Sequence, residues 1–406
     1  MSLERRLSVC YVVPGHDLLS SIGPTRNVLN LAQALGKWAD VTVAFHRTAD
    51  PSPPADLRVL EIEPAVAATT VDDAAMRGVG YGQFLSYMRQ LHRFVQRDLR
   101  PFDIILEKSW LLSGYISELC RRRGQLGVPI ENIVPNPKHA AQQSFSKLMR
   151  LRFGRWMAGR NLRHAPLIIA ETEYLKKEIA QYWRVQVDRI AVVDLGVDRK
   201  LFHPIDAQFA RHKLGISSER KILMYVGVLD RTHNLEPAIS ALCASNTLDC
   251  ELHIVGDGFR REDYQRLAAG ARSTVVFHGR VAHSEVPNYI AAADLCLAPY
   301  DATAFSSGEL GYSTMKIPEY LSVGRAVVSV PSGRTRMLLR EGETGFLFSN
   351  DVAQWTAFLG QLPTRERLSE MGAAAAQVEL PSWEDTARSY LSLCTHQLGL
   401  NGRLEA

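Results

Sequence analysis

The chain has 406 residues, which is enough for two domains of ordinary size. Its hydrophobic content of 46% and charged content of 22% are those of a globular protein. The formal net charge of +4 is too small to indicate a dedicated nucleic-acid-binding protein. No run of about 18 apolar residues occurs, so we expect no membrane-spanning helix.

The six cysteines are scattered along the chain and form no C-x-x-C pair. This pattern favours reduced, buried thiols over a disulfide framework or a metal site. No long apolar run follows the N-terminal charges, so we expect no signal peptide. Together these features predict a cytoplasmic protein.

The first half of the chain alternates strand-like and helix-like segments. Leu7–Val13 is a near-continuous apolar run, which is typical of a strand buried on both faces of a sheet. A polar loop leads from it into a helix whose apolar residues share one face. The further strands predicted here are Val41–Phe45, Leu57–Ile62, Phe102–Leu106, Ile130–Val134, Leu167–Ala170 and Ile190–Val193, and the further helices are Phe84–Val95, Leu112–Arg123, Gln142–Arg163 and Glu173–Tyr182.

The second half begins after the segment Asp194–Pro204, which no amphipathic pattern crosses. The strands predicted beyond it are Ile222–Val226, Glu251–Val255, Thr274–Phe277, Leu295–Leu297, Ala326–Val330 and Gly345–Phe348, and the helices between them are Leu235–Ala244, Arg261–Ala269 and Glu285–Ala293. Such alternation in both halves predicts an α/β protein made of two doubly wound domains with a cleft between them. We place the domain boundary near residue 198.

The stretch Ser306–Val330 carries the clearest sign of a ligand. A Gly/Ser/Thr-rich loop runs into a helix that Ser313 or Thr314 could cap and that ends at Gly324. Backbone N–H groups at such a helix start bind phosphate, and Lys316 adds a cation in a first turn where the helix dipole disfavours it. Glu319 follows one turn later and could accept ribose hydroxyls. Ligand-free junctions of this composition are also common in α/β proteins.

Seven segments of the second half occur in an order that resembles glycosyltransferase family 4. They are DLGVDRKLFHP, YVGVLDRTHNLEPAISAL, LHIVGDG, VVFHGRV, YIAAADLCLAPY, KIPEYLSVGRAVVS and EGETGFLF. The resemblance implies the GT-B fold, in which two Rossmann-like domains face each other across a cleft. It also implies retaining transfer from a nucleotide sugar. Residues 199–381 would then bind the donor, and residues 1–198 would bind the acceptor together with a crossover helix at about 382–400.

The resemblance also implies a set of donor-binding residues. The family commonly has Arg directly after the glycine that ends the first donor-domain strand, and Lys five residues further on. This chain has Val228 and His233 there, which leaves Arg231 or His233 as the substitute for those cations. The full set implied for the donor is Gly227, Arg231, His233, Gly256, Gly279, Arg280, Val281, Gly311, Tyr312, Ser313, Thr314, Lys316 and Glu319.

The reaction requires stabilisation of the negative charge that builds on the leaving diphosphate. The candidates for this role are Lys316, Arg231 and the free N–H groups of Gly311 to Thr314. Glu309 is the acid nearest to a family glutamate that contacts the transferred sugar. No Asp-x-Asp motif follows a strand, so we predict that no metal is needed. The resemblance implies a UDP or GDP sugar as donor and no other cofactor.

On the acceptor side, the resemblance implies Gly23 and Thr25 in the N-terminal loop. His139 is the nearest candidate for the family's active-site histidine, and an ordinary surface histidine is the alternative. The stretch Lys138–His164 contains seven Lys or Arg residues and no acid, counted from the sequence. It is either an ordinary helix whose apolar face covers the sheet, the reading we favour, or a peripheral contact with anionic lipid at the inner membrane face.

The acceptor is not readable from these residues: a glycan, a lipid-linked saccharide and a small molecule all remain open, while a nucleic acid is not expected. Two other functions also remain open. A nucleotide-sugar epimerase can share this fold, and the missing Arg and Lys would suit a catalytically inactive protein that binds sugar nucleotides.

Overall fold

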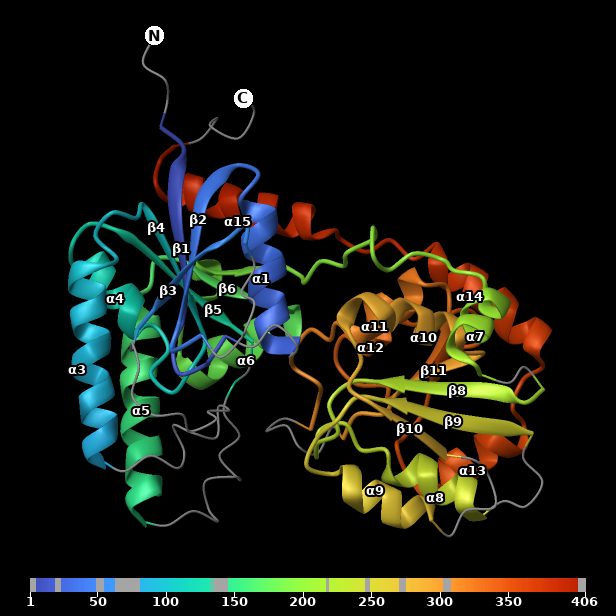
Figure 1. The fold of residues 1–406 in the computed structure, drawn as a ribbon. Helices are drawn as coiled ribbons and strands as arrows, with labels where there is room; N and C mark the ends of the chain where they lie inside the picture. Colours follow the sequence, from blue (N-terminus) through green and yellow to red (C-terminus); the bar gives the residue numbers. More distant parts are fainter. Residues whose placement is uncertain are drawn as a thin grey trace. The chain divides into compact units, whose positions relative to one another are not determined.

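A computed structural model describes residues 5–18, 23–48, 55–62, 81–132, 134, 145–216, 219–244, 249–269, 275–301 and 308–400 (Figure 1). The chain divides into two compact units. Unit 1 contains Met1–Gly196, Gly311–Ser313 and Pro381–Ala406, and unit 2 contains Val197–Leu310 and Thr314–Leu380. Within the described part of the chain, no helix is both long and apolar enough to span a membrane.

Unit 1 is built on a parallel sheet in the order β3-β2-β1-β4-β5-β6-β7. The apolar strands lie between layers of helices, so both of their faces are buried. The strands are β1 (Leu7–Val13), β2 (Ala39–Phe45), β3 (Arg58–Glu61), β4 (Ile104–Lys108), β5 (Leu126–Glu131), β6 (Ile168–Ala170) and β7 (Ile190–Val192), and the helices are α1 (Gly23–Leu35), α3 (Tyr81–Arg97), α4 (Tyr115–Arg121), α5 (Phe145–His164), α6 (Glu173–Trp183) and α15 (Trp383–Gln397), with a short 3-10 helix η2 (Val187–Arg189).

Unit 2 is built on a second parallel sheet in the order β10-β9-β8-β11-β12-β13. Its strands are β8 (Lys221–Val226), β9 (Cys250–Val255), β10 (Val275–Gly279), β11 (Leu295–Ala298), β12 (Ala326–Ser329) and β13 (Gly345–Leu347), and its helices are α7 (Ala207–Leu214), α8 (Glu236–Ala244), α9 (Arg261–Ala268), η3 (His283–Glu285), α10 (Val286–Ala292), α11 (Lys316–Ser322), α12 (Thr335–Leu338), α13 (Val352–Gly360) and α14 (Arg365–Ala376).

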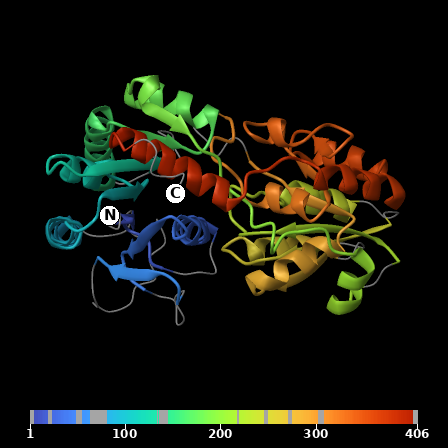
Figure 2. The same ribbon diagram turned by 90° about the horizontal axis from the view of Figure 1, so that it is seen from above.

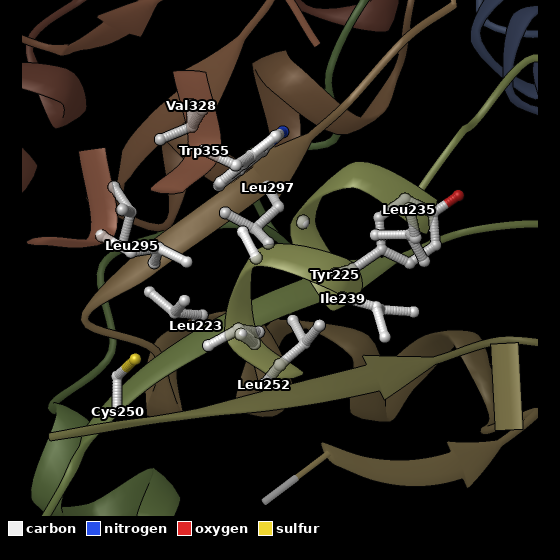
Figure 3. Close-up of a cluster of buried hydrophobic side chains, with 14 of the residues drawn as sticks. Leu223, Tyr225, Leu235, Ile239, Cys250, Leu252, Leu295, Leu297, Val328 and Trp355 are labelled. Carbon is white, nitrogen blue, oxygen red and sulfur yellow. The ribbon is translucent and has the colours of Figure 1, made fainter. Parts of the chain in front are cut away.

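The core of unit 2 supports the carboxyl end of β8. Figure 3 shows side chains of β8, β9 and β11 gathered with those of α8 and with Trp355 of α13. Tyr225 belongs to this cluster and is fully buried. Because it lies one residue before the end of β8, its ring fixes the start of the loop that follows the strand.

The C-terminal helix α15 returns to unit 1, as the family resemblance implied, and packs on α1 (Figures 1 and 2). A capping box of Ser382 and Asp385 fixes its start. The Thr386 hydroxyl donates to the Asp194 carbonyl over 2.9 Å. A Cβ on Gly196 would lie 2.4 Å from the Trp383 nitrogen, so this approach requires glycine.

One predicted strand has different bounds in the structure, and one helix was not predicted. The strand predicted over Ile130–Val134 is instead β5, because all six residues of Leu126–Glu131 are buried and the strand tolerates Gly127 and Pro129. Helix α7 was not predicted, since its many charges hide its periodicity. Its buried Arg211 forms an ion pair with Asp294 over 2.8 Å, a partner far away in sequence.

Candidate donor site in unit 2

Two glycine-containing loops pack against each other at the carboxyl ends of β8 and β9. The Gly227 N–H donates to Val255 O over 2.9 Å, and the Leu229 N–H donates to Asp257 O over 3.0 Å. A Cβ on Gly256 would lie 1.9 Å from Gly227 O, and a Cβ on Gly258 would lie 2.2 Å from Leu229 O. Glycine is therefore required where these two backbones meet. In open α/β sheets this edge is where ligands bind.

The Lys316 ammonium lies at this edge, between two aromatic rings. Its Nζ is 4.7 Å from the centroid of the Tyr225 ring and 5.3 Å from that of Tyr300. The ammonium also donates to the Tyr225 hydroxyl over 3.3 Å. A Cβ on Gly227 would lie 2.9 Å from Nζ, so the absence of a side chain there leaves room for the lysine. Cation–π contacts of this kind favour the charged amine.

Three tyrosine hydroxyls hold the walls of this site. Tyr225 donates to Val228 O over 2.6 Å, in the loop after β8. Tyr320 of α11 accepts from the Val226 N–H over 2.8 Å. The Tyr300 hydroxyl is hydrogen-bonded to the Thr314 hydroxyl, just before α11. The start of α11 is thus tied to the ends of β8 and β11, which fixes the base of the Lys316 side chain.

Asp230 and His233 form the polar side of the site. One Asp230 carboxylate oxygen accepts from the His233 ring and from the backbone N–H groups of Thr232 and His233, each over 2.9 Å. The His233 ring lies 5.3 Å from the Tyr300 ring. Asp230 therefore closes the turn that carries His233.

Burial lowers the pKa of Lys316 to about 7, although the charges of Asp230 and Glu319 oppose this shift. Burial and the Lys316 charge lower the pKa of His233 to about 4, against the effect of Asp230. His233 is therefore neutral at pH 7 and does not supply a cation. An arriving phosphate would favour the protonated form of Lys316, since opposite charges stabilise each other at short range.

The segment before α11 differs from the prediction. Helix α11 begins after Met315, which makes no side-chain cap, so neither Ser313 nor Thr314 caps it. The Ser313 N–H donates to Glu171 over 3.3 Å and its hydroxyl to Asp194 over 3.1 Å, while Gly311 O accepts from Thr172 over 2.7 Å. These contacts group Gly311, Tyr312 and Ser313 with unit 1 rather than with unit 2. The Ser313 N–H is accordingly not free.

The two remaining candidates for catalysis lie in different surroundings. Glu309 accepts from the Ser332 hydroxyl over 2.8 Å, from the Gly333 N–H over 2.7 Å and from Arg336 over 3.2 Å. Burial opposes its ionisation, but these hydrogen bonds outweigh it and lower the pKa of Glu309. The Arg231 side chain is exposed in the loop after β8. Asp230 and Glu319, rather than Glu309, are the carboxylates that act on Lys316.

Comparison with known families shows the family to which the chain belongs. The family described as Glycosyltransferase Family 4 matches residues 23–201, and the one described as Glycosyl transferases group 1 matches residues 220–364. The chain belongs to glycosyltransferase family 4. It is therefore a transferase that moves glycosyl groups, as the order of its motifs predicted.

Relatives and solved structures agree with this assignment. The chain is 25% identical over 337 residues to D-inositol 3-phosphate glycosyltransferase of Nocardioides sp., covering 77% of this chain and 71% of the relative. Sucrose-phosphate synthase of Thermosynechococcus elongatus superposes with a TM-score of 0.74 at 18% identity, covering 97% of this chain and all of the other (100%). Anabaena HepE, solved with UDP-glucose, superposes with a TM-score of 0.70 at 17% identity, covering 95% and 99%. The fold is GT-B, as predicted.

The family resemblance also placed three residues after the third donor-domain strand near the base. Gly279 ends β10, has a φ of 71° and accepts from the Gly256 N–H through its carbonyl over 2.7 Å. Arg280 is exposed, with its guanidinium 3.7 Å from Asp257, and Val281 is half-buried. These contacts link the loop after β10 to the two glycine-containing loops. Their role toward a base stays a prediction.

In unit 1, α1 begins at Gly23, and Thr25 is buried in its first turn. The role of these two residues toward an acceptor stays a prediction. His139 lies outside the described residues. Sequence reasoning passed over Glu107 and Glu131, which are buried at the carboxyl ends of β4 and β5. The apolar residues around them predict ordinary strands. An acid among the last two residues of a buried strand was the available signal.

Proposed function

We propose that this glycosyltransferase transfers a sugar, with retention of configuration, from a UDP or GDP sugar to an acceptor hydroxyl without a divalent metal. The observation that carries the proposal is the Lys316 ammonium, held between Tyr225 and Tyr300 beside Gly227. It provides a fixed cation at the sheet edge where the family resemblance puts the donor diphosphate.

Lys316 meets the main chemical demand of the reaction. Negative charge builds on the diphosphate as the anomeric C–O bond breaks, and a donor already in place stabilises that charge without reorganising. The tyrosine contacts supply the preorganisation. With the charge of His233 suppressed and Arg231 exposed, Lys316 takes the place of the Arg and Lys that the family commonly uses.

The acceptor hydroxyl would attack from the face that the diphosphate leaves, which retains the configuration. A leaving-group oxygen of the diphosphate would take the proton of the attacking hydroxyl. No carboxylate is assigned as a nucleophile, since Glu309 is held by Ser332, Gly333 and Arg336.

The first donors and acceptors to test come from the comparisons. The HepE structure holds UDP-glucose, and the Nocardioides relative is named for D-inositol 3-phosphate. A thermal-shift screen of UDP and GDP sugars identifies the donor, because a ligand that binds only the folded state raises its stability. Release of nucleoside diphosphate is then measured with D-inositol 3-phosphate and with a panel of glycan and lipid-linked acceptors.

Three outcomes separate the functions. Release that depends on an acceptor supports the proposed transferase. Conversion of the donor to an epimer without an acceptor indicates an epimerase, and binding without turnover across the panel indicates an inactive binding protein. NMR of the product gives its anomeric configuration, and an inverted product would contradict retention.

Metal independence is tested on the same reaction. We expect turnover in EDTA to equal turnover in added magnesium, because Lys316 supplies the charge that a divalent ion supplies elsewhere. Loss of turnover in EDTA that magnesium or manganese restores would contradict this part of the proposal.

A further inference from the structure

Helix α5 of unit 1 exposes large apolar side chains to solvent. Met149 is 51% exposed, Phe153 52% and Trp156 57%. Their spacing of four and three residues puts them on one face of the helix. The exposed residues Arg152, Arg160 and Arg163 fall on the same face, and together these six side chains are called the α5 stripe.

The inward face of α5 combines small residues with Leu162. Ala158 and Leu162 are buried, and a Cβ on Gly154 would lie 2.7 Å from the side chain of Leu111. A Cβ on Gly159 would lie 2.9 Å from the Trp183 ring. The helix therefore packs closely against unit 1 through glycine and alanine while its largest side chains point away. The inward face is thus apolar, as the favoured reading of the sequence expects, and large apolar side chains also lie on the outward face.

The charge on the α5 stripe has one sign. The sequence of α5 contains no Asp or Glu. Within the described chain, Arg152, Arg160 and Arg163 form no ion pair with a carboxylate. The Arg160 guanidinium lies 6.0 Å from the Trp156 ring, and the Phe153 and Trp156 rings lie 6.1 Å apart. Cations and aromatic rings therefore alternate along one continuous surface.

We propose that the α5 stripe docks the protein on the surface of an anionic phospholipid bilayer. Phenylalanine and methionine side chains leave water when they enter the boundary between headgroups and acyl chains. Tryptophan does the same and keeps its N–H near the wet headgroups. Arginines beside them bind lipid phosphates. A nucleic acid fits less well, because the exposed apolar area would gain little from a phosphate backbone. The contact is peripheral and does not depend on the proposed transfer reaction.

The test is co-sedimentation of the full chain with vesicles. The vesicles are made of phosphatidylcholine alone or with phosphatidylglycerol, at low and at physiological salt. We expect binding to the anionic vesicles that weakens with salt, and little binding to the neutral ones. Neutralising two arginines in the Arg152→Gln/Arg160→Gln variant should weaken binding about 30-fold.

The apolar part is tested by the Phe153→Ser/Trp156→Ser variant, which should bind about tenfold more weakly. Its matched control is Phe209→Ser/Phe259→Ser, because these phenylalanines of unit 2 are 62% and 68% exposed and lie outside the stripe. The control should bind like the original protein. Thermal unfolding of all variants checks that they fold.

Three results would overturn the proposal. The first is a protein that stays in the supernatant with anionic vesicles at low salt. The second is equal binding by the stripe variants and the control, which would move the contact elsewhere. The third is stripe-dependent binding to duplex DNA without binding to vesicles, which would indicate a nucleic-acid surface instead.

Discussion

The two units place different ionisable groups at the carboxyl edges of their sheets. In unit 2 the edge holds an amine, Lys316, between two tyrosines. In unit 1 the edge holds two acids, Glu107 and Glu131. Glu107 accepts from Trp110 over 2.8 Å and from the Ser117 N–H over 2.8 Å and hydroxyl over 2.7 Å. Two sheets of similar topology therefore present different electrostatics to a ligand.

The protonation of the two edges explains what each can do. Burial raises the pKa of Glu131 to about 8, with the Glu107 charge adding to the shift, so Glu131 is largely protonated at pH 7. Burial acts on Lys316 in the opposite sense and brings its pKa to about 7. A diphosphate arriving at Lys316 draws a proton onto the amine and forms an ion pair. Burial also raises the pKa of Glu107, so both acids at the unit 1 edge are shifted toward the protonated form.

The largest effect is expected where the unit 2 edge is most closely packed. The change Gly256→Ala puts a Cβ 1.9 Å from Gly227 O at a φ of 131°. We expect about 4 kcal/mol of lost stability, measured by urea unfolding. Gly360→Ala is the control, because nothing lies within 4 Å of a Cβ there. Equal stability of the two variants would show that the loops after β8 and β9 are not packed in this way.

Removing the amine tests whether the charge serves the reaction. The change Lys316→Met keeps a long unbranched side chain but removes the amine. It should lower kcat about a hundredfold, with a smaller effect on KM, because the charge on the diphosphate develops in the transition state. Arg231→Ala, which alters an exposed cation of the neighbouring loop, should have a clearly smaller effect. An effect of Lys316→Met on KM alone would limit the lysine to binding.

The carboxylate beside that amine is expected to act on the donor's ribose. The change Glu319→Ala should weaken nucleotide-sugar binding at least tenfold by calorimetry, since losing a charged hydrogen bond costs about 1.5–3 kcal/mol. Glu309→Ala is the comparison, because its carboxylate is held by Ser332, Gly333 and Arg336. Unchanged affinity in Glu319→Ala would remove it from the donor site.

A further effect concerns the acid edge of unit 1 and its dependence on pH. Because the pKa of Glu131 is raised above its ordinary value to about 8, the folded state binds more protons than the unfolded state over this interval. Its contribution to stability is complete below about pH 4.5 and is lost as the pH rises toward 8. Relative to the original chain, Glu131→Gln should therefore be more stable at pH 8 than at pH 5.5.

Urea midpoints at the two pH values measure this difference. The histidines of unit 2 have the opposite sign: burial lowers the pKa of His253 and of His278, so their contribution is lost as the pH falls below about 6.5. A Glu131→Gln variant whose midpoint differs from the original chain by the same amount at both pH values would show that Glu131 ionises normally.

The sequence by itself determined the alternation of strands and helices in both units and the left-handed Gly324, whose φ is 77°. It also pointed to Lys316, because a cation in the first turn of a helix opposes the local dipole. These features are readable since periodicity and helix ends depend on neighbours within a few residues. The family was recognised from the order of seven sequence motifs, which can be read without a structure.

Only the tertiary structure decided which groups surround Lys316 and which face of α5 points outward. Tyr225 is 91 residues away from Lys316 in sequence, and no local pattern links them. The glycines of α5 are explained only by tertiary packing, because Leu111 and Trp183 lie against them. Ser313 appeared to be a helix cap, but Glu171 and Asp194 bind it instead. Long-range contacts such as these compete with local preferences and override them, because packing and buried hydrogen bonds stabilise a fold more than a single cap does.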